Sequence, residues 1–342
     1  MVAIFTTRIL WQTWGFTTVV WVAGTTEGKS KIEKISNSQQ HDLNSEQPPV
    51  IDYEGSDYQS SFWNHGGREY EDQVEEIALR RLLPDNGGLL LELGAGAGRN
   101  TNRYQGFKRI VLLDYSFSQL QLAQYRLGES SRYIYVAADV YRLPFVSGLF
   151  DFSTMIRTLH HLVDAPRALH QVRRVLGKNG GFILEYASKK HWKAILRYIL
   201  GKQSWDPFTT ETVENVELNF NFHPKTIRAW MEANSFKIER QLTVSHFRSN
   251  FIKQLVPLQM LVGMDSLAQL SGDLWQLTPS VFVKASTTGS SPIPDGSAFF
   301  QCPACDFFPL EESNEYCLCP SCTHHWEIRD GVYDFRLPTP EE

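Results

Sequence analysis

The chain alternates between short, mostly apolar runs and longer segments in which apolar residues recur at a helical period. Apolar runs bounded by turn-forming residues are typical of strands buried on both faces of a parallel sheet. Such runs occupy residues 89–93, 109–113, 133–137, 149–156 and 182–186. Segments with a helical period lie before or between them, at 71–83, 117–127 and 165–176. Strands that alternate with helices in this order predict an α/β fold with a mostly parallel sheet.

Residues 187–287 have a less regular pattern. Apolar periodicity predicts helices over 191–200, 225–234 and 254–277, and strands at 236–244 and 279–284. Pro257 lies near the start of the last of these helices.

The first strand runs into three glycines at alternate positions, Gly94, Gly96 and Gly98, and Glu92 precedes them by two residues. Alternate glycines let the backbone turn sharply. A strand, a glycine turn and a helix N-terminus together allow a polar ligand to approach the backbone closely. A dinucleotide-binding loop would need glycine at the sixth position, where this chain has Arg99. The loop therefore predicts the floor of a nucleotide-like pocket and disfavours a dinucleotide site.

Two aspartates follow later strands. Asp114 ends the second strand, 20 residues after Gly94, which is the distance at which a carboxylate reaches the hydroxyls of a ribose. Asp139 belongs to the run A-D-x-x-x-L-P-F at 138–145, after the third strand. Each has a simpler alternative role, because Asp114 can cap the next helix and Asp139 can satisfy its own turn. Their position after the glycine loop favours ligand binding.

The glycine motif, the aspartate at 114, the run at 138–145 and the block at 159–184 together resemble class I S-adenosylmethionine (SAM) dependent methyltransferases. The block at 159–184 is similar to quinone-type and related small-molecule members of that family. The resemblance implies a Rossmann-like α/β fold, with a seven-stranded, mostly parallel sheet, helices on both faces and SAM as the cofactor. It also implies that residues 187–287 supply the last two strands and an insertion that covers the substrate.

The same resemblance assigns the cofactor contacts. Asp114 corresponds to the acid that binds the ribose, and Asp139 to the acceptor for the adenine amino group. Arg157 is a candidate partner for the SAM carboxylate, with a surface position as the alternative. The cofactor-binding set implied in this way is Glu92, Gly94, Ala95, Gly96, Gly98, Asp114, Tyr115, Asp139, Val140 and Arg157.

Two histidines are the candidate catalytic residues. His160 and His161 follow the fourth strand, where the resemblance places the methyl group. Histidine titrates near neutrality and suits a general base, which methyl transfer needs only if the acceptor must lose a proton. Packing or capping is the alternative role for one of the pair. His223, Tyr53 and Tyr58 are less favoured candidates.

All five cysteines lie between residues 302 and 322, and four of them form two C-x-x-C pairs separated by thirteen residues. Two such pairs supply the four thiolates of a closed tetrahedral zinc site. Cysteines confined to one short segment indicate a reducing compartment and not a disulfide framework. The expected ligands of a structural Zn²⁺ are Cys302, Cys305, Cys319 and Cys322, with Cys317, His324 and His325 as alternative ligands and redox thiols or disulfides as an alternative use.

The tail at 326–336 resembles the end of small zinc ribbons that are fused to methyltransferases or partner them, some of which act on ribosomal or transfer RNA. A basic excess usually accompanies binding to phosphates, whereas this chain of 342 residues has a net charge of −5. We therefore predict a SAM-dependent methyltransferase with a small-molecule or lipid-like acceptor. The alternatives are an RNA (rRNA or tRNA) methyltransferase that docks through the ribbon, and a non-catalytic SAM-binding adaptor whose ribbon contacts a protein.

The sequence divides into a hydrophobic extension with a linker at 1–49, a methyltransferase domain at 50–287, a linker at 288–299 and a zinc ribbon at 300–337. The apolar run near the start is shorter than the roughly 20 residues of a membrane-spanning helix and is closer to the apolar part of a signal peptide. A misplaced start codon or a loose extension are the alternatives. We expect a cytoplasmic protein, with membrane association through residues 1–24 as the alternative.

Overall fold

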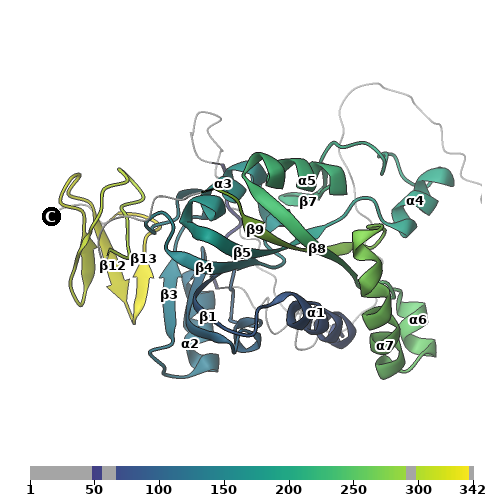
Figure 1. Ribbon diagram of the computed structural model, residues 1–342, viewed down its shortest axis with the longest axis horizontal. Coiled ribbons are helices and arrows are strands. Elements are labelled where there is room, and N and C mark those ends of the chain that lie inside the picture. The colour runs from purple at the N-terminus through teal and green to yellow at the C-terminus, as the bar shows by residue number, and fades with distance from the viewer. Residues whose placement is uncertain (1–47, 56–66, 290–297, 339–342) are drawn as a thin grey trace, which may run out of the picture. The chain divides into compact units, whose positions relative to one another are not determined.

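Strand pairing organises the described part of the chain, which comprises residues 48–55, 67–289 and 298–338 of a computed structural model. The main sheet has the order β10-β11-β12-β13-β3-β2-β1-β4-β5-β9-β8 (Figure 1). Strands β3, β2, β1, β4 and β5 are mutually parallel, and β9 runs antiparallel to both β5 and β8. The central strands are β1 (Gly87–Leu93), β2 (Phe107–Asp114), β3 (Tyr133–Ala137), β4 (Phe150–Met155), β5 (Leu176–Ala187), β8 (Phe236–Val244) and β9 (Ser280–Thr287).

The sheet has 11 strands, so the expected number of seven is wrong. The additional strands are β10 (Glu311–Glu312), β11 (Tyr316–Leu318), β12 (His325–Arg329) and β13 (Val332–Asp334). Strand β13 pairs in parallel with β3, in the register Val332↔Tyr135. Without β13, strand β3 would be an edge with unpaired N–H and C=O groups, and β13 pairs with that edge.

Helices cover both faces of the sheet, as expected for alternating strands and helices (Figure 1). Side chains of successive strand residues point to opposite faces, so Leu91 and Leu93 pack with α3 and α5 while Leu90 packs with α1, α2 and α7. Each face thus has its own apolar core. The helices are α1 (Glu69–Leu82), α2 (Phe117–Leu127), α3 (Ala165–Val175), α4 (Trp192–Ile199), α5 (Pro224–Ala233), α6 (Asn250–Leu255) and α7 (Leu258–Ala268).

The single helix expected over 254–277 is wrong. Helix α6 ends at Leu255, α7 begins at Leu258, and a 3-10 turn follows at Gln269–Asp273. Proline has no backbone N–H to donate inside a helix but is tolerated at a helix start. Pro257 is accordingly the N-cap residue of α7. A hairpin of β6 (Val213–Val216) and β7 (Asn219–Asn221), which sequence periodicity did not predict, lies before α5.

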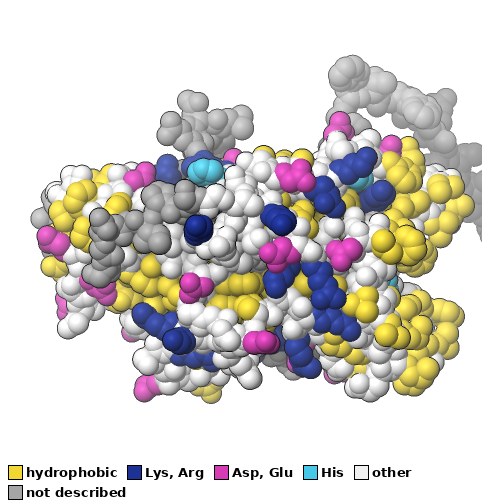
Figure 2. All heavy atoms as spheres, viewed as in Figure 1, with side chains coloured by type: hydrophobic (Ala, Val, Ile, Leu, Met, Phe, Trp, Pro, Cys, Tyr) yellow, Lys and Arg dark blue, Asp and Glu magenta, His cyan; other side chains and the backbone are white. Residues whose placement is uncertain are grey.

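Apolar side chains gather at the surface over α4 and over α6 and α7 (Figure 2). No helix in the described ranges is long and apolar enough to cross a membrane. The predictions for residues 1–47, including the membrane alternative for 1–24, concern residues outside the described ranges, as does the candidate Tyr58.

Candidate functional site

The glycine loop closes the carboxyl end of β1 and borders a cavity. Gly94 has a positive φ of 67°, and a Cβ there would lie 2.0 Å from Oγ1 of Thr158. Gly96 also has a positive φ, 51°, yet an added Cβ would meet no atom within 4 Å. Glycine is therefore required at 94 by packing and at both positions by backbone conformation. The open space above Gly96 leaves the loop accessible to a ligand.

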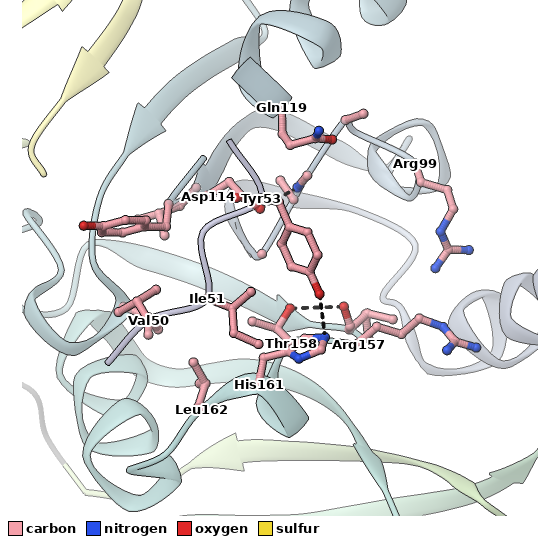
Figure 3. Close-up of a pocket in the computed structure, with 18 of the residues that line it drawn as sticks. Val50, Ile51, Tyr53, Arg99, Asp114, Gln119, Arg157, Thr158, His161 and Leu162 are labelled. Atoms are coloured by element: carbon pink, nitrogen blue, oxygen red, sulfur yellow. Dashed lines mark hydrogen bonds between the residues drawn. The ribbon is translucent and has the colours of Figure 1, made fainter. Parts of the chain in front are cut away.

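The cavity lies at the carboxyl ends of the central strands, where ligands bind in open α/β sheets (Figure 3). It combines loop backbone, apolar side chains and a few polar groups, as is typical of small-molecule sites. The lining residues are Val50, Ile51, Tyr53, Gly94, Ala95, Gly96, Ala97, Arg99, Asn100, Leu113, Asp114, Tyr115, Gln119, Ala138, Val140, Ile156, Arg157, Thr158, His161 and Leu162.

Most of the residues expected at the site line this cavity. They are Gly94, Ala95, Gly96, Asp114, Tyr115, Val140, Arg157 and His161. Four others, Glu92, Gly98, Asp139 and His160, are not among the lining residues. The lining also includes Gln119 and Thr158, which the sequence did not single out, and the roles of all these residues remain predictions.

Glu92 lies behind the glycine loop. It is buried and accepts a hydrogen bond from Oγ1 of Thr101 at 2.6 Å. Burial raises the pKa of Glu92 to about 7, although the hydrogen bond from Thr101 opposes the rise. This carboxyl group therefore supports the loop from inside the fold.

Asp114 receives two backbone N–H groups. Oδ2 accepts from Gly96 at 2.7 Å, and Oδ1 accepts from Ser116 at 3.0 Å. Burial raises the pKa of Asp114, and the N–H groups of Ser116 and Gly96 oppose that rise. A carboxylate oxygen can accept more than one hydrogen bond, so Asp114 ties the loop to β2 and keeps acceptor capacity for a ligand.

Asp139 caps a short helix. Its Oδ1 accepts from the backbone N–H of Tyr141 at 2.8 Å, at the start of the 3-10 helix Val140–Arg142. Burial raises its pKa, and the hydrogen bond from Tyr141 opposes the rise. The local role that the sequence left as an alternative is thus present, while the neighbouring Ala138 and Val140 line the cavity.

A buried glutamate holds two arginines at the cavity wall. Oε1 of Glu75 accepts from Nε of Arg157 at 2.8 Å, and Oε2 accepts from Arg99 at 2.9 Å. Burial alone would raise the pKa of Glu75, but the guanidinium groups of Arg157 and Arg99 lower it to about 2. Arg157 has a positive φ of 57°, an unusual conformation that clusters at functional sites, and its backbone N–H donates to Glu185 at 3.0 Å.

His161 presents one ring nitrogen toward the cavity (Figure 3). Nδ1 lies 3.2 Å from the carbonyl oxygen of Leu218, and Nε2 lies 3.2 Å from the hydroxyl of Tyr53. A carbonyl only accepts, so Nδ1 carries the hydrogen and Nε2 accepts from the Tyr53 hydroxyl. Burial lowers the pKa of His161, and the hydrogen bond to Leu218 opposes the fall. The arrangement yields a neutral imidazole with a basic Nε2.

His160 lies beside His161 without lining the cavity. The two ring centroids are 4.0 Å apart, and Nδ1 of His160 is buried without a hydrogen-bond partner among the described residues. Burial, followed by the neighbouring His161, Arg157 and Arg248, lowers the pKa of His160 well below its usual value. The remaining histidine candidate, His223, caps α5 through its Nδ1 and does not line the cavity.

Residues 48–55, here called the strap, border the cavity, and the sequence singled out only Tyr53 among them, as a less favoured catalytic candidate. Val50, Ile51 and Tyr53 line the cavity. Glu54 accepts hydrogen bonds from the N–H groups of Phe117 at 2.9 Å and Ser118 at 3.1 Å. These N–H groups belong to the first turn of α2, where a negative charge is favourable. Glu54 lies in an aromatic, polar segment of the sequence, but no local pattern indicated that it would contact the first turn of α2.

The four cysteines of the C-x-x-C pairs come together. Their Sγ atoms all lie within 4.8 Å of one another, with separations of 3.6 Å for Cys302–Cys322 and 3.5 Å for Cys305–Cys319. These separations exceed a disulfide bond of about 2.05 Å. They approach the roughly 3.8 Å between sulfurs that surround one metal tetrahedrally at about 2.3 Å. Cys317 is outside the cluster and pairs with Trp326 in the ribbon hairpin.

Comparisons with known proteins concern the segment that builds the cavity. Residues 91–184 match the family model described as a methyltransferase domain. The demethylmenaquinone methyltransferase of Thermobifida fusca is 32% identical over 102 residues, which are 29% of this chain and 43% of that protein. The demethylmenaquinone methyltransferase of Clavibacter sepedonicus is 26% identical over 162 residues, 46% of this chain and 66% of that protein.

A solved SAM-dependent methyltransferase from Mesorhizobium loti is 21% identical to this chain, with a TM-score of 0.46. The alignment covers 62% of this chain and 97% of that protein. The matches span 43% and 66% of the length of the two curated relatives. The matched segment contains the glycine loop, both aspartates and the histidine pair. Residues 91–184 are therefore similar to a methyltransferase domain.

Proposed function

We propose that this protein is a SAM-dependent methyltransferase with a small-molecule or lipid-like acceptor. The observation that carries the proposal is the hydrogen bond from the Gly96 N–H to the Asp114 carboxylate, at 2.7 Å. It joins the open glycine loop to a half-buried acid at the carboxyl ends of β1 and β2, within the segment that matches a methyltransferase domain. This combination supports binding of a ribose-containing cofactor.

The residues present are compatible with SAM. Asp114 has acceptor capacity for the ribose hydroxyls, and Ala138 with Val140 offers an apolar surface for an adenine ring. Asp139 has one carboxylate oxygen beyond its cap interaction and is proposed to accept from the adenine amino group. Arg157, already paired with Glu75, would share its guanidinium with the carboxylate of the cofactor. Gly94, Ala95, Gly96 and Gly98 would form the floor, with Tyr115 beside the ribose and Glu92 as their support.

When bound, SAM supplies an electrophilic methyl group on a sulfonium. The chain's part is to position the acceptor, which can contribute a large share of the acceleration, and to remove a proton where the acceptor carries one. Nε2 of His161 is the proposed base, since it faces the cavity and its partner Leu218 fixes the tautomer. His160 is proposed as a positioning residue that packs against the His161 ring.

The acceptor class rests on the relatives and on charge. The two curated relatives named above are demethylmenaquinone methyltransferases, and we propose an acceptor of related apolar character for this chain. The net charge of −5 gives no general attraction to nucleic acid. Residues 187–278 are proposed to select the acceptor, because Leu218 of this stretch contacts His161 directly.

We further propose that Cys302, Cys305, Cys319 and Cys322 bind a structural Zn²⁺. Four thiols at nearly tetrahedral spacing match a closed site without an open coordination position, and Nδ1 of His324, an alternative ligand, lies 3.1 Å from Sγ of Cys322. Bound metal would stabilise the ribbon that supplies β13 to the main sheet. The ribbon is thereby a part of the sheet's edge as well as a surface for contacts.

The test is transfer of radiolabelled methyl from SAM by the full chain into fractionated extract of its source cells. We expect label in the organic-soluble fraction, lost in Asp114→Asn and retained in Asp151→Asn. Asp151 is a matched control, because it accepts the N–H of Leu89 at 2.8 Å without lining the cavity. Ribonuclease-sensitive label would overturn the acceptor class, and SAM binding without label in any fraction would overturn the enzyme assignment.

A further inference from the structure

Helix α4 carries its apolar stripe on the outside. Trp192, Leu196 and Ile199 recur at the spacing of one helical face and are 52%, 47% and 70% exposed. Ala194 is the one residue that this helix buries in the described structure. An amphipathic surface helix normally turns its apolar stripe toward the core. The apolar stripe of α4 therefore faces away from the core and is available for contact with an apolar partner outside the protein.

Helices α6 and α7 present a second outward apolar face. Phe251, Leu255, Met260 and Leu267 are between 59% and 74% exposed. Among the exposed residues between 250 and 275, all of which the structure describes, Asp273 is the one charged residue, and its Oδ1 accepts the backbone N–H of Gln241 at 2.7 Å. Contiguous apolar surface of this kind marks an interaction site on a folded protein.

The two apolar faces adjoin each other. The backbone N–H of Trp192, at the start of α4, donates to the carbonyl of Leu277 at 3.0 Å, three residues after Leu274. Leu274 and Trp275 are 81% and 58% exposed and continue the apolar face from the end of the 3-10 turn. Figure 2 shows apolar side chains gathered over α4 and over α6 and α7 at the same end of the described structure. We refer to the exposed apolar residues of 192–200 and 251–275 as the α4–α7 surface.

Basic residues flank this surface. Lys193 and Arg197 lie one position after Trp192 and Leu196 and therefore border the apolar stripe of α4, and Lys202 follows the helix; all three are exposed. Residues 187–205 contain no Asp or Glu, although the chain as a whole has a net charge of −5. Apolar and aromatic side chains bordered by Lys and Arg are the composition of helices that lie in the interface of an anionic bilayer.

We propose that the α4–α7 surface docks the protein on an anionic lipid bilayer. The apolar side chains would enter the boundary between headgroups and acyl chains, while Lys193, Arg197 and Lys202 pair with lipid phosphates. A second copy of the chain is a poorer occupant, since a twofold contact presents the same patch on both subunits and would bring these basic residues together. The inference is independent of the proposed activity.

The experiment is co-sedimentation of the full chain with vesicles of phosphatidylcholine alone or mixed with phosphatidylglycerol. We expect binding to the mixed vesicles that weakens as salt is raised. Lys193→Glu/Arg197→Glu should lower the partition coefficient about tenfold or more, since each basic residue near the surface contributes about 1 kcal/mol. Trp192→Ser/Ile199→Ser and Leu267→Ser/Leu274→Ser should each weaken binding to both kinds of vesicle.

Two controls change the same residue types elsewhere. Leu122→Ser/Tyr125→Ser replaces exposed apolar residues of α2, and Lys178→Glu/Lys237→Glu reverses exposed charges on β5 and β8. Thermal unfolding of every variant verifies that it is folded. The proposal is overturned if the full chain ignores vesicles, or if the surface variants bind as well as the unchanged protein, which would assign binding to another segment. It is also overturned if light scattering shows a dimer that Trp192→Ser/Ile199→Ser dissociates.

Discussion

The hydroxyl of Tyr53 lies 3.2 Å from Nε2 of His161, across 108 positions of sequence. Because the Leu218 carbonyl fixes the hydrogen on Nδ1, Tyr53 donates to the basic nitrogen and stabilises the neutral ring. The strap therefore contributes directly to the protonation state of the proposed base. An acceptor hydroxyl that replaced Tyr53 at this nitrogen would stand in position to lose its proton.

Replacement of His161 tests its role as a base. His161→Gln should lower kcat by about 10²–10⁴-fold for an acceptor that must lose a proton, with little change in the Kd for SAM. His170→Gln, an exposed histidine on α3, is the matched control and should leave both unchanged. Steady-state kinetics together with calorimetric SAM binding measures the two effects. Equal losses in both variants would argue against a specific role.

The pH profile gives a second, independent check on the Tyr53–His161 pair. Burial lowers the pKa of His161, so kcat/KM should rise with pH through a value below about 6.5 and be level at neutral pH. Tyr53→Phe removes the donor that stabilises the neutral ring, so the acid limb should move to higher pH. The measurement is the pH profile of kcat/KM for Tyr53→Phe, compared with that for Tyr125→Phe, which changes an exposed tyrosine on α2. An unchanged acid limb in Tyr53→Phe would show that Tyr53 does not affect the pKa of His161.

Asp114→Asn should raise the Kd for SAM by about 10–100-fold, because hydrogen bonds to charged groups contribute about 1.5–3 kcal/mol. The substitution keeps the size of the side chain and one acceptor oxygen, so the fold should persist. Asp151→Asn, whose carboxylate also accepts a backbone N–H, should bind SAM normally. Calorimetry on both variants measures the difference, and equal affinities would remove Asp114 from the site.

Local sequence predicted most of the elements but not the contacts between distant ones. Strand β3 at Tyr133–Ala137 and helix α2 at Phe117–Leu127 agree with the expected ranges, because apolar runs and helical periods record burial directly. The pairing of β13 with β3 could not be read in this way, since backbone hydrogen bonding between strands leaves no side-chain signature. The same applies to Glu75, which the sequence did not single out and which pairs with Arg99 and Arg157 from other elements.

Two buried glutamates should make opposite contributions to the pH dependence of stability. The folded-state pKa of Glu75 is lowered to about 2 by Arg157 and Arg99 against the effect of burial, so its stabilisation is complete above the unfolded value of 4.5 and is lost as pH falls toward 2. The folded-state pKa of Glu92 is raised to about 7 by burial, so its contribution is present below 4.5 and is lost as pH rises through 7.

At pH 8, Glu75→Gln should therefore lower the free energy of unfolding by about 3–5 kcal/mol, as for a broken buried ion pair. Glu92→Gln should raise it by up to about 3 kcal/mol, because a neutral amide avoids the cost of ionising a buried acid. Urea unfolding of both variants from pH 4 to pH 8, compared with the exposed Glu129→Gln, measures these changes. Effects of the same sign in Glu75→Gln and Glu92→Gln would contradict this account.

The purified protein should contain one Zn²⁺ per chain, measured by elemental analysis. Cys305→Ser should remove it, whereas Cys317→Ala should retain it because Cys317 lies outside the four-cysteine cluster. Folding free energy of small zinc modules comes from the metal, so a chelator should lower the Tm of the ribbon. Hydrogen exchange should then rise at Val332–Asp334 and in the paired strand β3. If Cys305→Ser contained as much Zn²⁺ as the unchanged protein, this set of four ligands would be excluded.

The strap should control how long the cofactor stays bound. Glu54 links the strap to the first turn of α2 and accepts from Arg336 of the ribbon tail at 3.5 Å. Glu54→Gln removes a charge that the helix N-terminus favours by about 0.3–1 kcal/mol, so the global Tm should change little. The rate of SAM dissociation should nevertheless rise several-fold, because Val50, Ile51 and Tyr53 cover the cavity.

Arg336→Met should produce a smaller increase in the same rate, since its link to Glu54 is longer than the helix contacts and partly exposed. Stopped-flow dissociation of SAM from both variants measures the order of effects, with Glu129→Gln beyond the other end of α2 as the control. If Glu54→Gln released SAM no faster than Glu129→Gln, the strap would be a fixed wall of the cavity. If Arg336→Met alone accelerated release, the ribbon would act on the cavity by a route other than Glu54, such as its contact with the Tyr115 carbonyl at 3.3 Å.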